Sequence, residues 1–215
     1  MAKILPGETD IYAITDAGLS LGRPLEEVVS ALLGAGVRIV QYREKKLKAG
    51  AMLEECRLLR RLTAEAGACF IVNDHIDIAM LVKADGVHVG QEDLPVPAVR
   101  SLVGQDMIIG LSTHMPEQAR AARSLGADYI GVGPIFATKT KEDVVAPVGY
   151  DYLDWVSSHA DLPFVAIGGI KQHNIAEVAR HGARCCSLVS ELVGAPDIRA
   201  RVESVRNAMR EGMVG

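Results

Sequence analysis

Two aspartates follow neighbouring apolar runs between residues 69 and 94 and are the first sign of chemistry in this sequence. Asp74 ends the run CFIVND, and Asp93 comes shortly after the run GVHVG, with a helix-like segment between the two runs. Carboxylates that lie close together repel each other unless a cation or a proton lies between them. The alternatives are that Asp74 caps the following helix, because Asp is a favoured N-cap, and that Asp93 belongs to a polar turn.

Basic side chains follow another apolar run, VRIVQYR. Strand side chains alternate, so Ile39, Gln41 and Arg43 are expected to share a face, with Gln41 and Arg43 near the end of the run. Arg43 can hold phosphate oxygens as a fork and Lys45 as a point charge. Each alone is typical of a surface, but together with the lysines of a later loop they predict an anion site.

That later loop spans residues 133–149 and is long and polar for a connection after a strand. Its hydroxyls and cations belong to Thr138, Lys139, Thr140 and Lys141. Loops of this length are often functional, although an ordinary mobile loop is the alternative. With phosphate groups nearby, the cation between the aspartates is expected to be Mg²⁺, which is typically held by one or two carboxylates and phosphate oxygens.

A second group of small and polar residues follows the last two apolar runs. Gly168 and Gly169 end the run PFVAIGG, and Val189 and Ser190 end the run ARCCSLVS. Glycines let the backbone come close to a ligand, and the loops after strands seven and eight of a barrel often form a phosphate cup. These positions predict a second anion site.

Neutral polar residues complete the set of candidates. Asn73 and Ser112 end strand-like runs and are suited to donate to a phosphate oxygen or a polar substrate edge. His88, inside the run GVHVG, is either a hydrogen-bonded core histidine or a residue that faces the substrate. His114 is more typical of a solvated loop.

The elements that position these residues alternate between strand and helix along the whole chain. Eight strand–helix units indicate parallel strands, because each crossover returns the chain to the same end of the sheet. Eight units in a chain of this size predict a closed eight-stranded (β/α)₈ TIM barrel. A doubly wound open sheet is the rival, but it usually needs fewer units, and no GxGxxG follows the first strand. With no linker evident, residues 1–215 are expected to form a single catalytic domain.

Composition limits the remaining classes. The 215 residues carry a net charge of −4 and are 49% hydrophobic, so no nucleic-acid surface is expected. No run of apolar residues is long enough to cross a membrane, and the N-terminus lacks the apolar core of a signal peptide, which predicts a cytoplasmic protein. The four cysteines show no CxxC spacing and are expected to be small buried hydrophobes, with Cys185 and Cys186 on opposite faces of a strand.

In a barrel, the C-terminal ends of the strands meet at one mouth. The sequence therefore predicts two anion sites and one divalent cation over a single cavity. A pyrophosphate with Mg²⁺ on one side and a monophosphate on the other would fit, and the residues alone leave the substrate open.

The chain resembles the thiamine-phosphate synthase family through the segments VQYREK, FIVNDHIDIAMLVKADGVHVGQEDLP, IGLSTH, GADYIGVGPIFATKTK and AIGGI, in order between about residues 11 and 195. The resemblance implies a transferase of thiamine biosynthesis that joins 4-amino-2-methyl-5-pyrimidinylmethyl diphosphate to 4-methyl-5-(2-phosphoethyl)thiazole by a Mg²⁺-assisted dissociative substitution. It implies a pyrimidine diphosphate site formed by Gln41, Arg43, Lys45, Asn73, Ser112 and Lys141, one Mg²⁺ held by Asp74 and Asp93, and a thiazole phosphate site formed by Thr138, Lys139, Thr140, Gly169, Val189 and Ser190.

Three rivals are weighed against this resemblance. A thiazole tautomerase of the same superfamily lacks parts of the diphosphate and metal set, which this chain has in full. An aldolase-type barrel would need a desolvated lysine, which a polar loop is poorly suited to provide. A non-catalytic phosphate-binding barrel would need no Mg²⁺. A homo-oligomer is possible.

Overall fold

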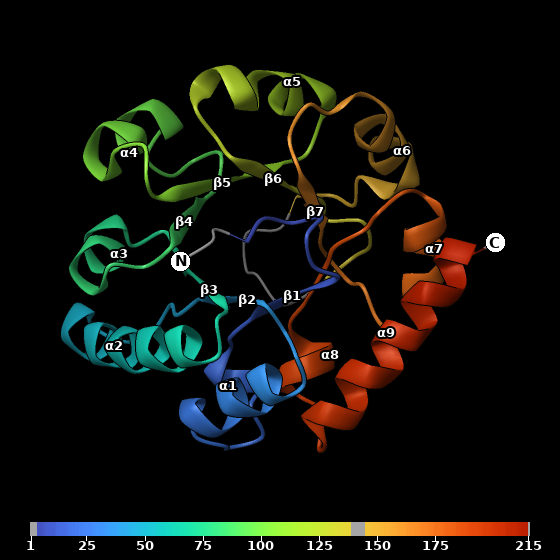
Figure 1. Cartoon of the computed structure of the whole chain (residues 1–215). Coiled ribbons are helices and arrows are strands. Elements are labelled where there is room, and N and C mark those ends of the chain that lie inside the picture. The colour runs from blue at the N-terminus through green and yellow to red at the C-terminus, as the bar shows by residue number, and fades with distance from the viewer. Residues whose placement is uncertain (1–3, 139–144, 215) are drawn as a thin grey trace.

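Eight parallel strands close into a barrel in the computed structural model of the chain, which describes residues 4–138 and 145–214 (Figure 1). Each strand pairs with the next along the chain, and the last pairs with the first, so the sheet has no free edge. This confirms the predicted TIM barrel. The strands are β1 (Ile11–Ile14), β2 (Ile39–Tyr42), β3 (Cys69–Asn73), β4 (Gly86–Val89), β5 (Ile108–Thr113), β6 (Tyr129–Val132), β7 (Phe164–Ala166) and β8 (Cys186–Leu188).

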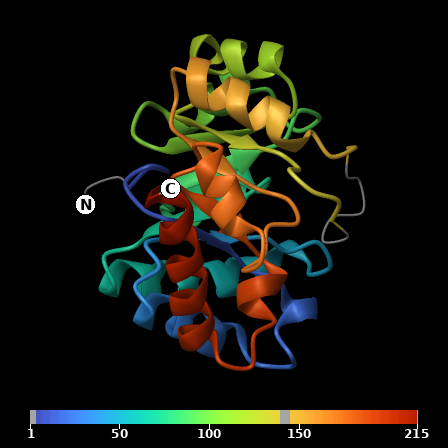
Figure 2. The same ribbon diagram turned by 90° about the vertical axis from the view of Figure 1, so that its right-hand side faces the viewer.

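Helices surround the strands as an outer layer. They are η1 (Ala17–Leu19), α1 (Leu25–Gly34), α2 (Ala49–Glu65), α3 (Ile76–Val82), α4 (Val96–Val103), α5 (Pro116–Leu125), α6 (Gly149–His159), α7 (Ile175–Arg180), α8 (Ser190–Val193) and α9 (Ile198–Val214). The C-terminal helix α9 packs along α7 on the outside of the barrel (Figure 2). Among the described residues, none of the helices has the length and hydropathy that a membrane span requires.

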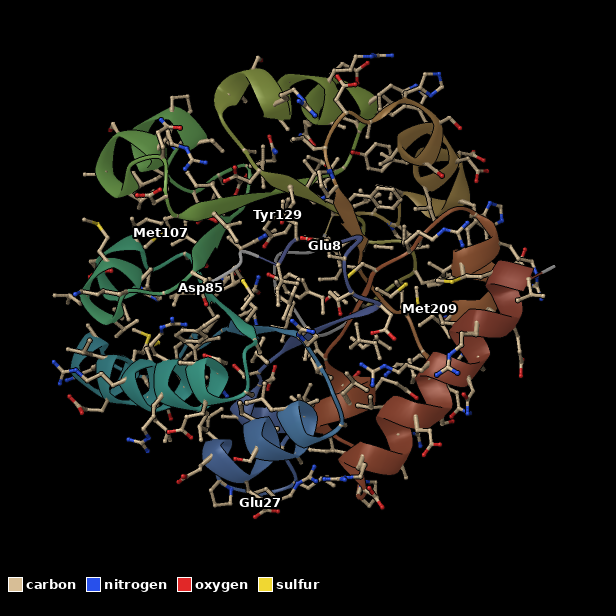
Figure 3. The ribbon with its side chains drawn as sticks, viewed as in Figure 1. Glu8, Glu27, Asp85, Met107, Tyr129 and Met209 are labelled. Atoms are coloured by element: carbon tan, nitrogen blue, oxygen red, sulfur yellow. The ribbon has the colours of Figure 1, made fainter. Side chains whose placement is uncertain are left out.

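Side-chain alternation on the strands divides the core into two layers. On β2, Ile39 belongs to the cluster inside the barrel, whereas Val40 packs in the layer between strands and helices. On β6, Tyr129 lies inside the ring of strands (Figure 3). The pair Cys185 and Cys186 is divided in the same way, as predicted. All four cysteines are buried and free, and burial raises the pKa of the Cys69 thiol to about 12, so it stays protonated.

Several strands are shorter than predicted, and the difference is largest at β6 and β8. The run DYIGVGPIF was expected to be extended to residue 136, but β6 ends at Val132, directly before Gly133 and Pro134. Proline has no N–H to donate to a neighbouring strand. The chain instead pairs with the segment directly after β7, where the N–H of Ile135 donates to the carbonyl of Ile167 at 2.9 Å. In the run ARCCSLVS, the strand covers only Cys186–Leu188, and a short helix begins at Ser190.

Candidate active site

The two aspartates lie on adjacent loops at the same end of the barrel. Strands β3 and β4 pair in parallel with Asn73 opposite His88, so the chain leaves both strands side by side. The N–H of Asp74 donates to the carbonyl of His88 at 3.0 Å, which extends this pairing by one residue. Asp93 lies on the loop that follows β4, where its Oδ2 accepts from the N–H of Gly90 at 2.7 Å.

The backbone and side chain of Asp74 are not those of a helix cap. Its φ of 61° lies in the left-handed region, which is unusual for a residue other than glycine. The N-cap of α3 is His75, and it makes no capping hydrogen bond with its side chain. Oδ2 of Asp74 instead lies 2.5 Å from Nζ of Lys45. The capping alternative for Asp74 is therefore wrong. The turn alternative for Asp93 agrees with its hydrogen bond to Gly90.

The loop after β2 presents the two basic candidates. The N–H groups of Lys45, Lys46 and Leu47 all donate to Oε1 of Glu44, at 2.7, 2.5 and 3.2 Å, which holds the loop in a tight turn. The N–H of Arg43 donates to the hydroxyl of Thr15 on the neighbouring β1 side at 3.1 Å. Its side-chain Nε is buried and has no hydrogen-bond partner among the described residues. A buried donor without a partner is costly, so a bound acceptor there would be favourable.

The donor set at this end of the barrel fits Mg²⁺. Asp74 and Asp93 each offer a carboxylate oxygen besides the Oδ2 already engaged, and the ammonium of Lys45 already lies against one of these carboxylates, as a cation would. Across residues 4–138 and 145–214, no group of three or more His, Cys, Asp or Glu side chains could hold a metal. A magnesium ion bound here would therefore take its remaining ligands from substrate oxygens and water, as Mg²⁺ commonly does.

Three neutral candidates lie on the inner face of the barrel. Gln41 and Asn73 are 3% and 6% exposed, so both side chains belong to the barrel interior. Nε2 of Gln41 donates to the hydroxyl of Tyr12 at 2.8 Å. Ser112, at the end of β5, is half-buried, and its Oγ lies 2.9 Å from Nε2 of His88.

The two histidines left open by the sequence are both held in place. His88 is 8% exposed and hydrogen-bonded inside the barrel, as the core alternative predicts, and one of its partners is the candidate Ser112. That it faces the substrate stays a prediction. Nδ1 of His114 lies 2.6 Å from the carbonyl of Gly133, and its N–H donates to Oε1 of Gln118. His114 is therefore an anchor for the start of the loop after β6 rather than a solvated side chain.

The second predicted anion site is described in part. Thr138 is half-buried, whereas Lys139 and Thr140 lie outside the described residues, as does Lys141 of the predicted diphosphate site. Gly168 and Gly169 have φ values of 100° and 66°. A Cβ on Gly169 would lie 2.8 Å from Cβ of Phe136, so the glycines admit the segment after β6. That these glycines also let the backbone come close to a ligand stays a prediction.

Lys171 was missed by the sequence reasoning and lies beside this second site. Its Nζ donates to Oγ of Ser190 at 2.6 Å, which links the loop after β7 to the loop after β8. Ser190 begins α8 and Val189 is its N-cap. A lysine directly after the AIGGI segment is the signal in the sequence, but a single lysine there is equally typical of a surface.

Comparison with known proteins decides which barrel family this is. The family model described as "Thiamine monophosphate synthase" matches residues 11–192. The chain is 60% identical over 212 residues to the thiamine-phosphate synthase of Lawsonia intracellularis, covering 97% of this chain and 98% of that one. It is 61% identical over 199 residues to the thiamine-phosphate synthase of Pelotomaculum thermopropionicum, covering 93% and 91%.

The chain belongs to the thiamine-phosphate synthase family. Among solved structures, thiamine phosphate pyrophosphorylase from Pyrococcus furiosus superposes with a TM-score of 0.86 at 35% identity, covering 95% of this chain and 96% of that one. As a thiamine-phosphate synthase, the chain is a transferase of thiamine biosynthesis.

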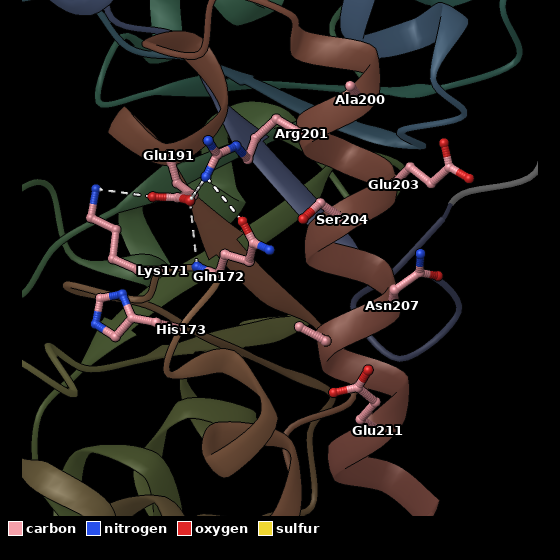
Figure 4. A pocket seen from close by; sticks show the side chains of 11 residues that line it. Lys171, Gln172, His173, Glu191, Ala200, Arg201, Glu203, Ser204, Asn207 and Glu211 are labelled. Atoms are coloured by element: carbon pink, nitrogen blue, oxygen red, sulfur yellow. Dashed lines mark hydrogen bonds and ion pairs between the residues drawn. The ribbon is translucent and has the colours of Figure 1, made fainter.

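A polar groove of about 860 Å³ lies beside Lys171 and along α9 (Figure 4). One wall is α9, and the other is formed by the loop after β7 and by Glu191 of α8. Oε1 of Glu191 lies 2.5 Å from Nη1 of Arg201 on α9, and Oε2 lies 3.5 Å from Nζ of Lys171. Glu191 thus connects the C-terminal helix to the lysine that contacts Ser190.

Proposed function

We propose that the chain joins 4-amino-2-methyl-5-pyrimidinylmethyl diphosphate to 4-methyl-5-(2-phosphoethyl)thiazole, which forms thiamine monophosphate and releases pyrophosphate. The observation that carries this proposal is the pairing of Lys45 with Asp74 beside the loop of Asp93. Cationic and anionic groups meet there at the mouth of the barrel, and Nε of Arg43, two residues before Lys45, has no hydrogen-bond partner among the described residues. A diphosphate with a divalent cation supplies the charges that complement this arrangement.

The proposed diphosphate site is formed by Gln41, Arg43, Lys45, Asn73, Ser112 and Lys141, of which Lys141 lies outside the described residues. Arg43 and Lys45 would contact phosphate oxygens, because a guanidinium and an ammonium supply several N–H donors and a full positive charge. Ser112 and Asn73 add neutral donors. The buried Nε of Arg43 would gain the acceptor that it lacks among the described side chains.

Asp74 and Asp93 would hold the Mg²⁺ in this proposal. When bound, Mg²⁺ would neutralise charge on the diphosphate and so make pyrophosphate a better leaving group. The ammonium of Lys45 would then share Asp74 with the ion or move to the diphosphate. Either arrangement keeps positive charge next to the oxygen that leaves.

The chain's own residues would act mainly by position and charge. The bond that breaks joins the methylene carbon of the pyrimidine to the bridging diphosphate oxygen, and its electron pair leaves with pyrophosphate. Arg43 and Lys45 would stabilise the negative charge that grows on that oxygen. The new bond joins the same carbon to the thiazole nitrogen, which contributes its lone pair, so the step depends on holding the two substrates in line. No side-chain nucleophile takes part.

The proposed thiazole phosphate site is formed by Thr138, Lys139, Thr140, Gly169, Val189 and Ser190. We add Lys171 to it, because its ammonium lies 2.6 Å from Oγ of Ser190 and would approach any phosphate that this hydroxyl binds. Glu191, which is itself held by Arg201, would orient the Lys171 side chain through its second carboxylate oxygen. Residues 1–215 would act as one catalytic domain on these two small molecules, without nucleic acid or a membrane.

A steady-state assay tests the function. Purified protein is incubated with both substrates and Mg²⁺, and pyrophosphate and thiamine monophosphate are measured together. We expect equal amounts of the two products and none when either substrate is left out. Isomerisation of the thiazole phosphate alone would favour the tautomerase alternative, and binding of both phosphates without turnover would favour a binding barrel.

A further inference from the structure

A run of hydrogen bonds crosses the inside of the barrel and joins two residues of the proposed diphosphate site. Gln41 on β2 donates from Nε2 to the hydroxyl of Tyr12 on β1, at 2.8 Å, and that oxygen lies 2.7 Å from the hydroxyl of Tyr129 on β6. The Tyr129 hydroxyl lies 2.9 Å from Nδ1 of His88 on β4, and Nε2 of His88 lies 2.9 Å from Oγ of Ser112 on β5.

The interior is built to hold this run. Tyr12 and Tyr129 are each 1% exposed, so water does not compete for their hydroxyls. Burial raises the pKa of both tyrosines well above its usual value, and each hydroxyl therefore keeps its single hydrogen. Gly110 on β5 provides the space: a Cβ there would overlap the Tyr129 ring and lie 2.5 Å from Nδ1 of His88.

With Nε2 of Gln41 as the first donor, counting hydrogens gives the direction of the run. Since Gln41 donates to the Tyr12 oxygen, the hydrogen of Tyr12 is available for the Tyr129 oxygen, and that of Tyr129 for Nδ1 of His88. A neutral His88 that accepts at Nδ1 carries its hydrogen on Nε2 and donates it to Oγ of Ser112. The hydrogen of Ser112 is then not used by the run.

The opposite direction is less favourable on two counts. If Tyr129 donated to Tyr12, the buried hydrogen of Tyr12 would have no acceptor within the run, and such a loss is costly. His88 would then donate from Nδ1 and accept the hydrogen of Ser112 at Nε2. Oγ of Ser112 would present only lone pairs to the barrel mouth, which would repel a phosphate oxygen.

We propose that Tyr129, Tyr12 and His88 are positioning residues for the diphosphate, because their directed hydrogen bonds hold His88 as the Nε2–H tautomer and leave the hydroxyl hydrogen of Ser112 free to donate at the mouth. The run also polarises that hydroxyl, since hydrogen bonds in a chain strengthen one another. This inference rests on the proposed function for the identity of the anion. The tautomer of His88 does not depend on that identity.

The first test reads the tautomer directly, without substrate. The protein is labelled with ¹⁵N-histidine, and the His88 signals are assigned by their loss in His88→Gln. We expect a protonated Nε2 and an unprotonated Nδ1 in the parent, with a shift toward the Nδ1–H form in Tyr129→Phe. A parent His88 that carries its hydrogen on Nδ1 would overturn the proposal.

Tyr152→Phe is a matched control for the loss of a buried tyrosine hydroxyl. Tyr152 is 6% exposed, and its hydroxyl donates to Oγ1 of Thr113, the neighbour of Ser112 on β5, at 2.7 Å. It lies in the layer outside the barrel and takes no part in the run. We expect Tyr152→Phe to leave the His88 tautomer unchanged.

The second test measures KM for each substrate. Tyr129→Phe is expected to raise KM for the pyrimidine diphosphate about tenfold, the effect of losing one hydrogen bond to a charged acceptor, with KM for the thiazole phosphate unchanged. Tyr12→Phe is expected to have a smaller effect, because Tyr129 can still donate to His88. Urea unfolding of each variant reports whether the fold is kept. If Tyr129→Phe does not fold, Tyr12→Phe takes its place in the KM measurement.

A double-mutant cycle with Ser112→Ala separates positioning from general loosening of the core. If Tyr129 acts through Ser112, adding Tyr129→Phe to Ser112→Ala should raise KM for the diphosphate no further. Effects that multiply in the double variant would overturn the proposal. A parent protein that makes no thiamine monophosphate would instead overturn the proposed function, and the histidine spectra would still decide the direction of the run.

Discussion

Nζ of Lys45 lies 2.5 Å from Oδ2 of Asp74, a residue whose backbone is left-handed. The lysine side chain is 54% exposed and the aspartate side chain 20%, so solvent weakens this pair. An ammonium at this position occupies the carboxylate that the proposed Mg²⁺ would bind. Lysine and metal would therefore compete for Asp74 when no diphosphate is bound.

Replacing Lys45 by methionine should change metal binding and substrate binding in opposite directions. Without substrate, Lys45→Met is expected to bind Mn²⁺, a paramagnetic substitute for Mg²⁺, a few-fold more tightly, since an exposed pair contributes at most about 1 kcal/mol. KM for the diphosphate should rise. Binding is measured by electron paramagnetic resonance. Lys46→Met on the same loop is the control, and an equal effect of both variants would contradict competition at Asp74.

The two aspartates are expected to matter through their charge. Asp93→Asn can keep the turn hydrogen bond to Gly90 through its amide oxygen, yet it should slow pyrophosphate release about a hundredfold and require more Mg²⁺. Asp77→Asn, an exposed acid on α3, is the control and should behave like the parent. If Asp93→Asn keeps the rate and magnesium requirement of the parent, Asp93 is only a turn residue.

Arg43→Ala should weaken one substrate selectively. Loss of the guanidinium removes charge-assisted hydrogen bonds to the diphosphate, so its KM should rise at least tenfold, while KM for the thiazole phosphate changes little. Both constants come from initial rates with the other substrate saturating. An equal rise in both would argue against two separate anion sites.

Lys171→Met should produce the reverse selectivity. Among the described residues its ammonium contacts Ser190 and Glu191, so KM for the thiazole phosphate is expected to rise several-fold while KM for the diphosphate stays the same. Glu191→Gln tests whether the carboxylate of Glu191 helps to position Lys171, because the variant keeps an acceptor for Arg201 but removes the negative charge. If Lys171→Met raised KM for the pyrimidine diphosphate instead, Lys171 would belong to the diphosphate site.

Much of this architecture could be predicted from the sequence, because the spacing of apolar residues differs between strands and helices. Continuous apolar runs and amphipathic stretches gave the eight units, and alternation placed Cys185 and Cys186 in different layers. The helices η1 and α8 span three and four residues, which is too short for a periodic pattern. Helix capping by Asp74 was a reasonable alternative from residue type, but the left-handed backbone directs its carboxylate to Lys45 instead.

The site itself was only partly visible in the sequence, since it depends on which strands meet across the barrel. Tyr12 and Tyr129 look like core residues in their own runs, and only the closed barrel brings their hydroxyls within 2.7 Å. Lys171 carries no local pattern that sets it apart from a surface lysine. Gly110, likewise, has no evident role until His88 and Tyr129 are placed beside it.

Gly110 gives a test of that packing by stability. Gly110→Ala would force a methyl group against Tyr129 and His88, and overpacking of this kind typically costs about 1–3 kcal/mol. Gly50→Ala in α2 meets no atom within 4 Å and should be neutral or stabilising by up to about 1 kcal/mol. Urea unfolding measures both. A Gly110→Ala variant as stable as the parent would mean that the interior has spare room.

Calorimetric titration of Mg²⁺ in the presence of pyrophosphate tests the central arrangement most directly, because it isolates the cation, the two carboxylates and the leaving group from turnover. We predict that the parent protein binds one Mg²⁺ with pyrophosphate and that Asp74→Asn and Asp93→Asn each weaken this binding at least tenfold, whereas Asp77→Asn does not. Equal magnesium affinity in the parent and both aspartate variants would contradict the proposed metal site.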